Sequence, residues 1–326
     1  MDKNKTYFIR GVSNDPYFNL ASEEYLLRHT DAYFVYLWIN SPAVIVGINQ
    51  NTAEEVNLDY TSENGIKVVR RQTGGGAVYH DLNNVCYTII AEYNGERDNY
   101  RYFTENIIGY LKTIGVSAEF SGRNDIVIDG KKISGNAQCV YKNRIMHHGT
   151  LLFDTDAAAL SLALKPHKLK VESKGIKSVR ARITNISEHL PAPMTTEEFF
   201  GGLADHFSKT AEPYSFTEGD INAINTLVKE KYSTFGWNVG FSPSAKMFAE
   251  KKFPYGLVKV NFNVENGKLS DVRVYGDFFS VKDVSGLNHA LNGVLYKKEA
   301  IEKALFEVER YVSGASCGDI AELFFE

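Results

Sequence analysis

Residues 70–81 read RRQTGGGAVYHD, and this stretch carries more information than any other in the 326-residue chain. Three consecutive glycines admit positive φ angles and let a ligand approach the backbone closely. Successive amides can form a nest for an anion, and Arg70 and Arg71 lie immediately upstream. The stretch predicts a loop that binds phosphate or carboxylate. Taken alone, a triple glycine is equally compatible with a flexible turn between two strands.

Two common nucleotide-binding patterns do not describe this loop. The sequence contains no G-x-x-x-x-G-K-[ST] motif, which excludes a Walker loop. Tyr79 stands where G-x-G-x-x-G would require its third glycine. If the loop binds an anion, it does so as neither of these two classes of site.

The segments around the loop predict a mixed α/β fold. Short β-branched and aromatic runs indicate buried strands over 33–39, 43–48, 66–70 and 85–91. Helical spacing covers 19–29 and 103–114. A hairpin over 126–140 turns at Asp129-Gly130, and 145–153 is a further strand. After Asp156 the balance shifts towards helix, and Thr195 with Glu198 predicts a capping box.

The end of the chain predicts a second, smaller unit. Residues 237–243 carry Gly and Pro between patterned segments and are a candidate linker. Beyond them, alternating apolar residues over 258–264 and 272–274 predict a hairpin that turns at Asn266-Gly267. Helical patterns cover 284–295 and 297–311. From about residue 245 the chain is expected to form a separate α+β domain.

Composition limits the function classes. With 36 basic and 40 acidic side chains the net charge is −4, so nothing global indicates a nucleic-acid or membrane partner, and phosphate binding must be local. The first residues lack the apolar stretch of a secretory signal, and the longest apolar run, 32–39, is far too short to span a bilayer. We expect a cytoplasmic protein. Three widely spaced cysteines argue against a disulfide framework and a cysteine zinc site.

The hairpin after residue 120 offers a second group of candidate site residues. Gly122, Arg123, Asn124 and Asp125 precede it, and residues 131–137 read KKISGNA. Adjacent strand residues point to opposite faces, so one lysine of the pair can point inward, and Lys132 is the candidate. A pair of lysines is more often a solvated strand edge.

Three further features of the sequence carry groups that could bind a ligand or take part in catalysis. His147 and His148 are adjacent on a strand and face opposite ways, which argues against one metal ion. Cys86 is expected in the core, whereas Cys139 follows Lys132 by one hairpin arm and could lie near the same site. Residues 165–182 carry seven Lys or Arg and a single acid, Glu172. This segment is either a loop that closes over phosphates or a solvated loop.

In order along the chain, the segments RRQTGGGAVYHD, GRNDIVI, KKISGNAQ, MHHGTLLFD and KGIKSVRARITNI closely resemble lipoate–protein ligases. The resemblance runs through nearly all of the first 245 residues, and the remainder resembles that family's C-terminal accessory domain. It implies an α/β catalytic domain of the biotin and lipoate ligase type over 1–244, with a mixed sheet and surrounding helices, and a small α+β accessory domain over 245–326.

The resemblance implies a reaction in two steps. Lipoate and ATP give lipoyl-AMP and pyrophosphate, and the lipoyl group then passes to a lysine of an apo lipoyl domain. The implied acceptors are acyltransferase subunits of 2-oxo-acid dehydrogenase complexes and the glycine cleavage H protein, and the implied enzyme is a monomer that also uses Mg²⁺. Lys132 matches the family lysine between the lipoyl carbonyl and the α-phosphate, where a cation neutralises developing charge.

Other roles are carried over from the same resemblance. Nucleotide or adenylate contacts are implied for Arg71, Gly76, Ala77, Val78, Tyr79, Asn124, Lys174, Ser178 and Arg180. Lipoate contacts are implied for Arg70, Gly74, Gly75, His148 and Gly149, with Lys132 in both sets. Asp125 is implied as an indirect magnesium anchor. Strand parity adds Trp38, Val44 and Val78 as candidate apolar walls.

Two alternatives stay open at this point. An octanoyl or lipoyl transferase on the same scaffold would pass the acyl group through a cysteine thioester without ATP, and Cys139 is the candidate relay. A non-catalytic protein that binds lipoate or a nucleotide would need the glycine loop alone. The basic segment and the accessory domain favour the adenylating enzyme over the first, and Lys132 favours it over the second.

Overall fold

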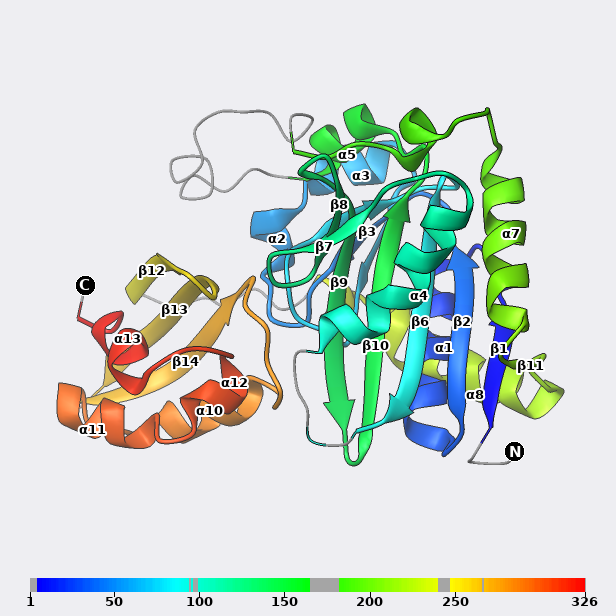
Figure 1. The fold of residues 1–326 in the computed structure, drawn as a ribbon. Helices are drawn as coiled ribbons and strands as arrows, with labels where there is room; N and C mark the ends of the chain where they lie inside the picture. The colour runs from blue at the N-terminus through cyan, green and yellow to red at the C-terminus, as the bar shows by residue number, and fades with distance from the viewer. Residues whose placement is uncertain are drawn as a thin grey trace.

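The computed structural model describes residues 5–93, 95, 99–164, 182–239, 247–265 and 267–325. Its largest sheet has eight strands: β1 (Thr6–Arg10), β2 (Tyr33–Ile39), β6 (Asn84–Glu92), β7 (Glu119–Ser121), β8 (Asp125–Ile128), β9 (Lys131–Tyr141), β10 (Arg144–Leu152) and β11 (Glu212–Pro213). The spatial order is β11-β1-β2-β6-β10-β9-β8-β7 (Figure 1). β1 is parallel to β2 and β11, and the other neighbours are antiparallel.

Strand β2 explains how this sheet is covered on both faces. Val35 and Leu37 join the core under α4 (Tyr100–Thr113) and α7 (Thr196–Ser208). Phe34, Tyr36 and Trp38 join the core formed with α1 (Pro16–His29) and α8 (Glu218–Leu227). Because successive side chains point to opposite faces, a strand buried on both sides must be apolar throughout. This is why 33–39 contains no charged residue.

A second sheet lies on the α1 side. It contains β3 (Ala43–Val46), β4 (Lys67–Arg70) and β5 (Val78–His80), in the order β4-β3-β5. Ile45 and Val69 share a core with Trp38 of the large sheet. The glycine loop joins β4 to β5, the two outer strands of this sheet, and the Thr73 hydroxyl of the loop lies 2.7 Å from Nε2 of His148 on β10 of the large sheet. Short helices complete this part: α2 (Thr52–Glu55), α3 (Leu58–Glu63), α5 (Ala157–Ala163), η2 (Ile186–His189), η3 (Val228–Tyr232) and α9 (Phe235–Asn238).

The C-terminal unit has its own sheet and core. Strands β12 (Met247–Phe253), β13 (Gly256–Glu265) and β14 (Lys268–Gly276) form an antiparallel sheet. Its core includes residues of α10 (Ser285–Leu291), α11 (Lys298–Ala304), α12 (Val308–Tyr311) and α13 (Cys317–Glu322). Figure 1 shows this unit, in yellow to red, beside the large sheet.

The mixed α/β class expected from the sequence is confirmed, with local corrections. Helix α1 begins at Pro16 and not at residue 19, because the Asp15 side chain caps it by accepting from the Tyr17 amide at 3.0 Å. The helix expected over 297–311 is two helices, α11 and α12. Within the described residues, none of the helices is both long and apolar enough to cross a membrane.

The expected linker over 237–243 is wrong at its first residues. Trp237 and Asn238 belong to α9, and both form hydrogen bonds with the backbone of strand β4. The Trp237 indole donates to the Arg70 carbonyl at 2.9 Å, and the Arg70 amide donates to the Asn238 side chain at 2.9 Å. Residues 240–243, the last four of that linker, lie outside the described residues.

Candidate functional site

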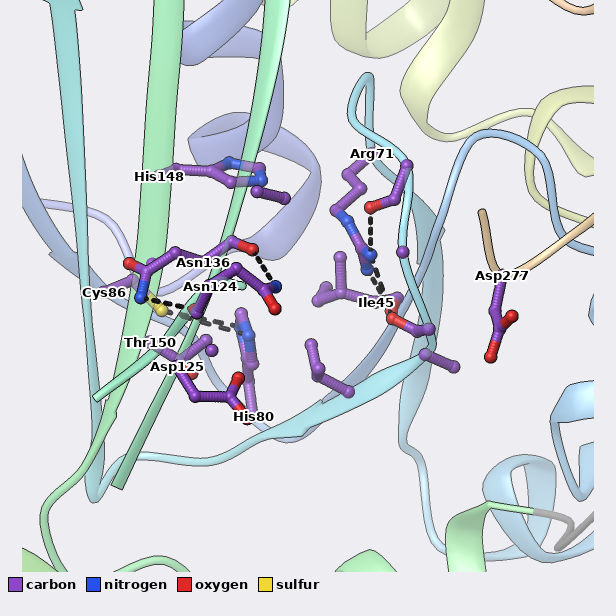
Figure 2. Close-up of a pocket in the computed structure, with 18 of the residues that line it drawn as sticks. Ile45, Arg71, His80, Cys86, Asn124, Asp125, Asn136, His148, Thr150 and Asp277 are labelled. Carbon is purple, nitrogen blue, oxygen red and sulfur yellow. Dashed lines mark hydrogen bonds between the residues drawn. The ribbon is translucent and has the colours of Figure 1, made fainter. Parts of the chain in front are cut away.

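A cavity of about 370 Å³ lies between the large sheet, the second sheet and the glycine loop. Part of its wall is apolar and includes Leu20, Trp38, Ile45, Val78, Ala137 and Phe279. Another part is polar and includes Gly74, Gly75, Gly76, Asn124, Asp125 and Lys132. Figure 2 shows Asn124 and Asn136 on one side and Arg71 and Asp277 on the other. One space therefore offers both an apolar and a charged surface to a ligand.

The glycine loop needs its glycines for packing. Gly75 has φ +91°, a conformation that side-chain-bearing residues rarely adopt. A Cβ on Gly74 would lie 2.7 Å from the Phe278 carbonyl oxygen, so the C-terminal unit approaches the loop too closely for any side chain there. The Gly75 amide also donates to that carbonyl at 3.4 Å. By contrast, a Cβ on Gly76 would meet nothing within 4 Å.

Arg71 stands behind the loop and fixes its shape. Its guanidinium donates to the carbonyl oxygens of Gly74 at 2.6 Å, Gly76 at 2.9 Å and Ile45 at 3.1 Å. It also donates to the Thr73 hydroxyl at 2.9 Å. Burial lowers the pKa of Arg71 to about 10, which leaves it charged at neutral pH. The side chain is 6% exposed and lines the cavity.

Arg70 does not line this cavity. Its guanidinium donates to the carbonyl oxygens of Gly47 at 2.8 Å and Gln50 at 2.7 Å and to the Thr52 hydroxyl at 2.8 Å. Burial lowers its pKa to about 10 as well. From the sequence, both arginines were expected to lie at an anion. In the structure, the hydrogen bonds of Arg70 instead link β4 to the segment after β3.

A buried hydrogen-bonded chain joins α1 to the glycine loop through His148. One ring nitrogen of His148, Nδ1, lies 2.8 Å from the Glu23 carboxylate, and Nε2 lies 2.7 Å from the Thr73 hydroxyl. The Thr88 hydroxyl donates to the same carboxylate at 2.5 Å and accepts from the Trp38 indole at 3.0 Å. The chain satisfies a carboxylate that is nearly excluded from water.

Lys132 and Asp125 form an ion pair at the polar wall. The ammonium nitrogen lies 2.7 Å from the carboxylate, and the two side chains are 36% and 35% exposed. The backbone of Lys132 is fixed as well, since its amide donates to the Arg182 carbonyl at 2.9 Å and its carbonyl accepts from the Thr184 amide at 3.1 Å. Lys132 lines the cavity, whereas Lys131 is exposed.

Gly149 makes room for an asparagine that lines the same wall. A Cβ on Gly149 would collide with the Asn136 side-chain oxygen, which also accepts from the Tyr87 hydroxyl. Asn136 donates in turn to the Asn124 carbonyl at 3.0 Å, and Asn124 donates to the Asn136 carbonyl at 2.5 Å. Gly149, Asn124 and Asn136 therefore act as one preorganised polar surface.

The cysteines have unreactive surroundings. Cys86 lines the cavity, and burial raises the pKa of its thiol well above the ordinary value. Cys139 is not among the lining residues, and burial raises its pKa to about 12. The idea that Cys139 lies at the site of Lys132 is therefore not supported by its position.

No cluster suited to a metal ion occurs among the residues that the structure describes. His147 and His148 face opposite sides of β10, as expected. The His147 ring stacks on Phe103 with centroids 5.0 Å apart, and burial lowers its pKa well below the ordinary value.

Most, but not all, of the candidate residues meet at the cavity. The lining includes Gly74, Gly75, Gly76, Ala77, Val78, Asn124, Asp125, Lys132, His148 and Gly149. The Tyr79 side chain belongs to a separate core, and so does Val44, whose expected place in the wall is taken by Ile45. Lys174, Ser178 and Arg180 lie outside the described residues.

The sequence did not reveal that the C-terminal unit contributes to this wall. Asp277 and Phe279 line the cavity from the segment after β14. The contact is secured nearby, because the Gly276 amide donates to the Asn49 carbonyl at 2.6 Å and the buried Lys259 pairs with Glu54 of α2. Contacts between units so far apart in the chain leave no local sequence pattern.

The fold and the cavity define a lipoyl protein ligase A/B catalytic domain, whose family model matches residues 15–208, and the model for the bacterial lipoate protein ligase C-terminus matches 242–324. The chain is 45% identical over 322 residues to lipoate-protein ligase LplJ of Bacillus subtilis, covering 96% of this chain and 97% of that one. It therefore belongs to the lipoate–protein ligase family and is an enzyme.

Solved structures agree with this assignment. The structure of P. falciparum LipL1 in complex with lipoate is 28% identical, with a TM-score of 0.78 and 97% of both chains covered. The structure of lipoate-protein ligase A bound with ATP is 28% identical, with a TM-score of 0.62, and covers 73% of this chain and 99% of that one. The family expected from the five sequence segments is confirmed.

Proposed function

We propose that this enzyme activates lipoate with ATP in the described cavity and transfers the lipoyl group to a lysine of an apo lipoyl domain. The observation that carries the proposal is the position of Lys132, whose ammonium lies on the polar wall of a cavity that also has an apolar wall. A fatty-acid-like substrate needs the apolar wall, and its carboxylate and the α-phosphate need a cation between them.

Adenylation and transfer proceed without a covalent enzyme intermediate. A carboxylate oxygen of lipoate attacks the α-phosphorus of ATP, the bond from that phosphorus to the bridging oxygen breaks, and pyrophosphate leaves with the electron pair. The acceptor amine, as the neutral amine, then attacks the acyl carbon, the bond from that carbon to the phosphate oxygen breaks, AMP leaves with the electron pair, and the nitrogen releases a proton to solvent. Lys132 offsets negative charge in both steps and forms no bond to the substrate.

Each candidate residue is assigned a role that suits its position. The backbone of Gly76, Ala77, Val78 and Tyr79, with Asn124, contacts the nucleotide, and Gly74, Gly75, His148 and Gly149 contact lipoate. Arg70 and Arg71 act by holding the loop, because their guanidinium groups are bonded to backbone carbonyls. The roles of Lys174, Ser178 and Arg180 at the adenylate remain part of the proposal.

The polar wall of the cavity suits a magnesium ion that is held mainly by the substrate. Mg²⁺ usually keeps several waters and is bound through one or two carboxylates plus phosphates. Asp125 lines the cavity and is the proposed indirect anchor of the ion. The ion would neutralise phosphate charge when ATP is bound.

The proposal extends to domains and partners. The catalytic domain spans 1–244 and the accessory domain 245–326, and the enzyme is a cytoplasmic monomer. Its acceptors are the lipoyl domains of 2-oxo-acid dehydrogenase complexes and the glycine cleavage H protein. These proteins present the lysine that the second step requires.

Exchange of labelled pyrophosphate into ATP tests the proposal. Exchange that requires lipoate is expected, because only an adenylating enzyme reverses the first step. An enzyme that shows no exchange but modifies apo lipoyl domains from an acylated carrier protein would be a transferase. Binding of lipoate with neither reaction would indicate a non-catalytic protein.

A further inference from the structure

Arg123 is a cation of the catalytic unit that is held by the C-terminal unit. It lies in the turn between β7 and β8, immediately before Asn124 and Asp125 of the cavity wall. Its guanidinium carbon lies 4.0 Å from the centre of the Phe279 ring, and one of its nitrogens donates to the Tyr255 carbonyl at 3.4 Å. Both of these partners come from the C-terminal unit.

Phe279 connects this cation to the glycine loop. The ring lines the cavity, and a Cβ on Gly75 would lie 3.3 Å from two of its carbon atoms. One side chain therefore contacts the guanidinium of Arg123 and the anion loop. Arg123 itself is not among the lining residues, but Asn124 and Asp125, which follow it in the chain, and Phe279, on which it stacks, all line the cavity.

Three other cations near the cavity are already engaged. Arg70 and Arg71 are bonded to backbone carbonyls, and Lys132 is paired with Asp125. Arg123, in contrast, is exposed and has no carboxylate partner among the residues that the structure describes. A guanidinium stacked on an aromatic ring keeps its edge donors available, and these donors match the oxygens of a phosphate group.

We propose that Arg123 contacts the β- and γ-phosphates of ATP and stabilises the leaving pyrophosphate, and that Phe279 and the Tyr255 carbonyl position it. The inference rests on the proposed adenylation. When the bond between the α-phosphorus and the bridging oxygen breaks, that oxygen gains the electron pair and pyrophosphate becomes more negative. A preorganised guanidinium stabilises this developing charge. The C-terminal unit thus acts in the first half-reaction.

The test compares the half-reactions in the full-length protein. Pyrophosphorolysis of lipoyl-AMP uses pyrophosphate, whereas transfer from isolated lipoyl-AMP to an apo lipoyl domain does not. We expect Arg123→Ala to raise the KM for pyrophosphate and for ATP roughly 10- to 100-fold, the usual effect of losing a charged contact. Transfer from lipoyl-AMP should stay at the wild-type rate. Arg123→Lys should recover part of the loss.

Two further variants separate positioning from docking. Phe279→Leu should raise the KM for pyrophosphate less than Arg123→Ala does, and the double variant should have no higher KM for pyrophosphate than Arg123→Ala, because the ring acts on pyrophosphate through the guanidinium. Arg101→Ala is the matched control, since the Arg101 guanidinium also lies over a ring, that of Phe120 at 5.2 Å, but Phe120 does not line the cavity, whereas Phe279 does. It should leave every KM unchanged.

Several outcomes would overturn the inference while leaving the proposed function intact. One is an Arg123→Ala enzyme with unchanged KM for pyrophosphate and ATP. Another is an equal fall of both half-reactions in kcat, which would assign Arg123 to domain docking alone. A wild-type enzyme that does not convert lipoyl-AMP and pyrophosphate to ATP would instead remove the proposed function itself.

Discussion

The ammonium of Lys132 and the carboxylate of Asp125 lie 2.7 Å apart at the wall of the cavity. Each is about one-third exposed, so the attraction is moderate and can be exchanged for contacts with a substrate. A lysine has several rotatable bonds, and without this partner the ammonium would sample many positions. In the reaction that we propose, the pair therefore holds the cation ready for an incoming carboxylate and phosphate.

Replacing Lys132 with Met should abolish lipoyl-AMP formation while the fold stays intact. A methionine retains most of the length of the side chain but not its charge, and losing a preorganised charge contact costs roughly 10²- to 10³-fold in rate. Lipoate-dependent pyrophosphate exchange measures the effect, with Lys131→Met as the control because Lys131 is exposed. Near wild-type exchange by Lys132→Met would contradict the assigned role.

Replacing Cys139 with Ser should leave lipoate transfer nearly unchanged. Burial raises the pKa of this thiol to about 12, so very little thiolate forms at neutral pH. The rate of modification of an apo lipoyl domain checks this, with mass spectrometry of the parent protein. Loss of transfer together with an acyl-cysteine in the parent would support the transferase alternative.

Stability should fall as the pH drops below 6.5, and His80 should cause part of the fall. Burial, followed by the charges of Arg71 and His148, lowers the pKa of His80 from 6.5 to about 3, so the unfolded chain binds a proton that the native protein does not. The part of the stability that depends on a neutral His80 is fully present above pH 6.5 and is lost as the pH falls towards 3. Between pH 7 and pH 5 this residue should account for about 2 kcal/mol of unfolding free energy.

Urea unfolding at the two pH values tests this dependence. His80→Gln should show a smaller difference between pH 7 and pH 5 than the wild type. His29 is exposed, so His29→Gln should keep the full difference. An unchanged pH dependence in His80→Gln would mean that the ring is protonated in the native protein.

Neighbouring glycines of the loop should respond differently to alanine. At Gly75 the φ of +91° and the Phe279 ring at 3.3 Å predict a loss of roughly 1–2 kcal/mol of stability. At Gly76 a Cβ meets nothing within 4 Å, so stability should change by less than about 0.5 kcal/mol. Nucleotide affinity should nevertheless fall in Gly76→Ala, because in the proposed site the nucleotide contacts the backbone there.

Thermal unfolding and titration with ATP distinguish these two effects. Equal stability losses in both variants would show that the glycines serve folding only. Unchanged ATP affinity in Gly76→Ala would place the nucleotide away from this residue.

Much of the catalytic unit could be predicted from local sequence. Strand β2 has the predicted bounds because its whole length is apolar, and the capping box of Thr195 and Glu198 begins α7 as predicted. Val44 was misplaced because parity defines two faces of a strand but not which face meets the cavity. Arg70 was misplaced because a charged residue beside glycines can bind either an anion or backbone carbonyls. Only the folded chain distinguishes these cases.

The contribution of Phe279 could not be predicted for a different reason. It depends on how the C-terminal unit docks on Gly74 and Gly75, which are about 200 positions earlier in the chain. A local pattern cannot encode a contact over that separation. Arg123 was noted within its motif, but its two partners were unknown for the same reason.

The composite wall of the cavity also has a thermodynamic consequence. A ligand that contacts both Phe279 and the glycine loop must bind the docked arrangement of the two units more tightly than an undocked one. Linkage is reciprocal, so whatever factor docking adds to ligand affinity, the ligand adds to docking. A bound ligand therefore stabilises the docking of the two units. A mutation at a contact far from the cavity, such as that of Lys259 with Glu54, should in turn change the affinity for substrate.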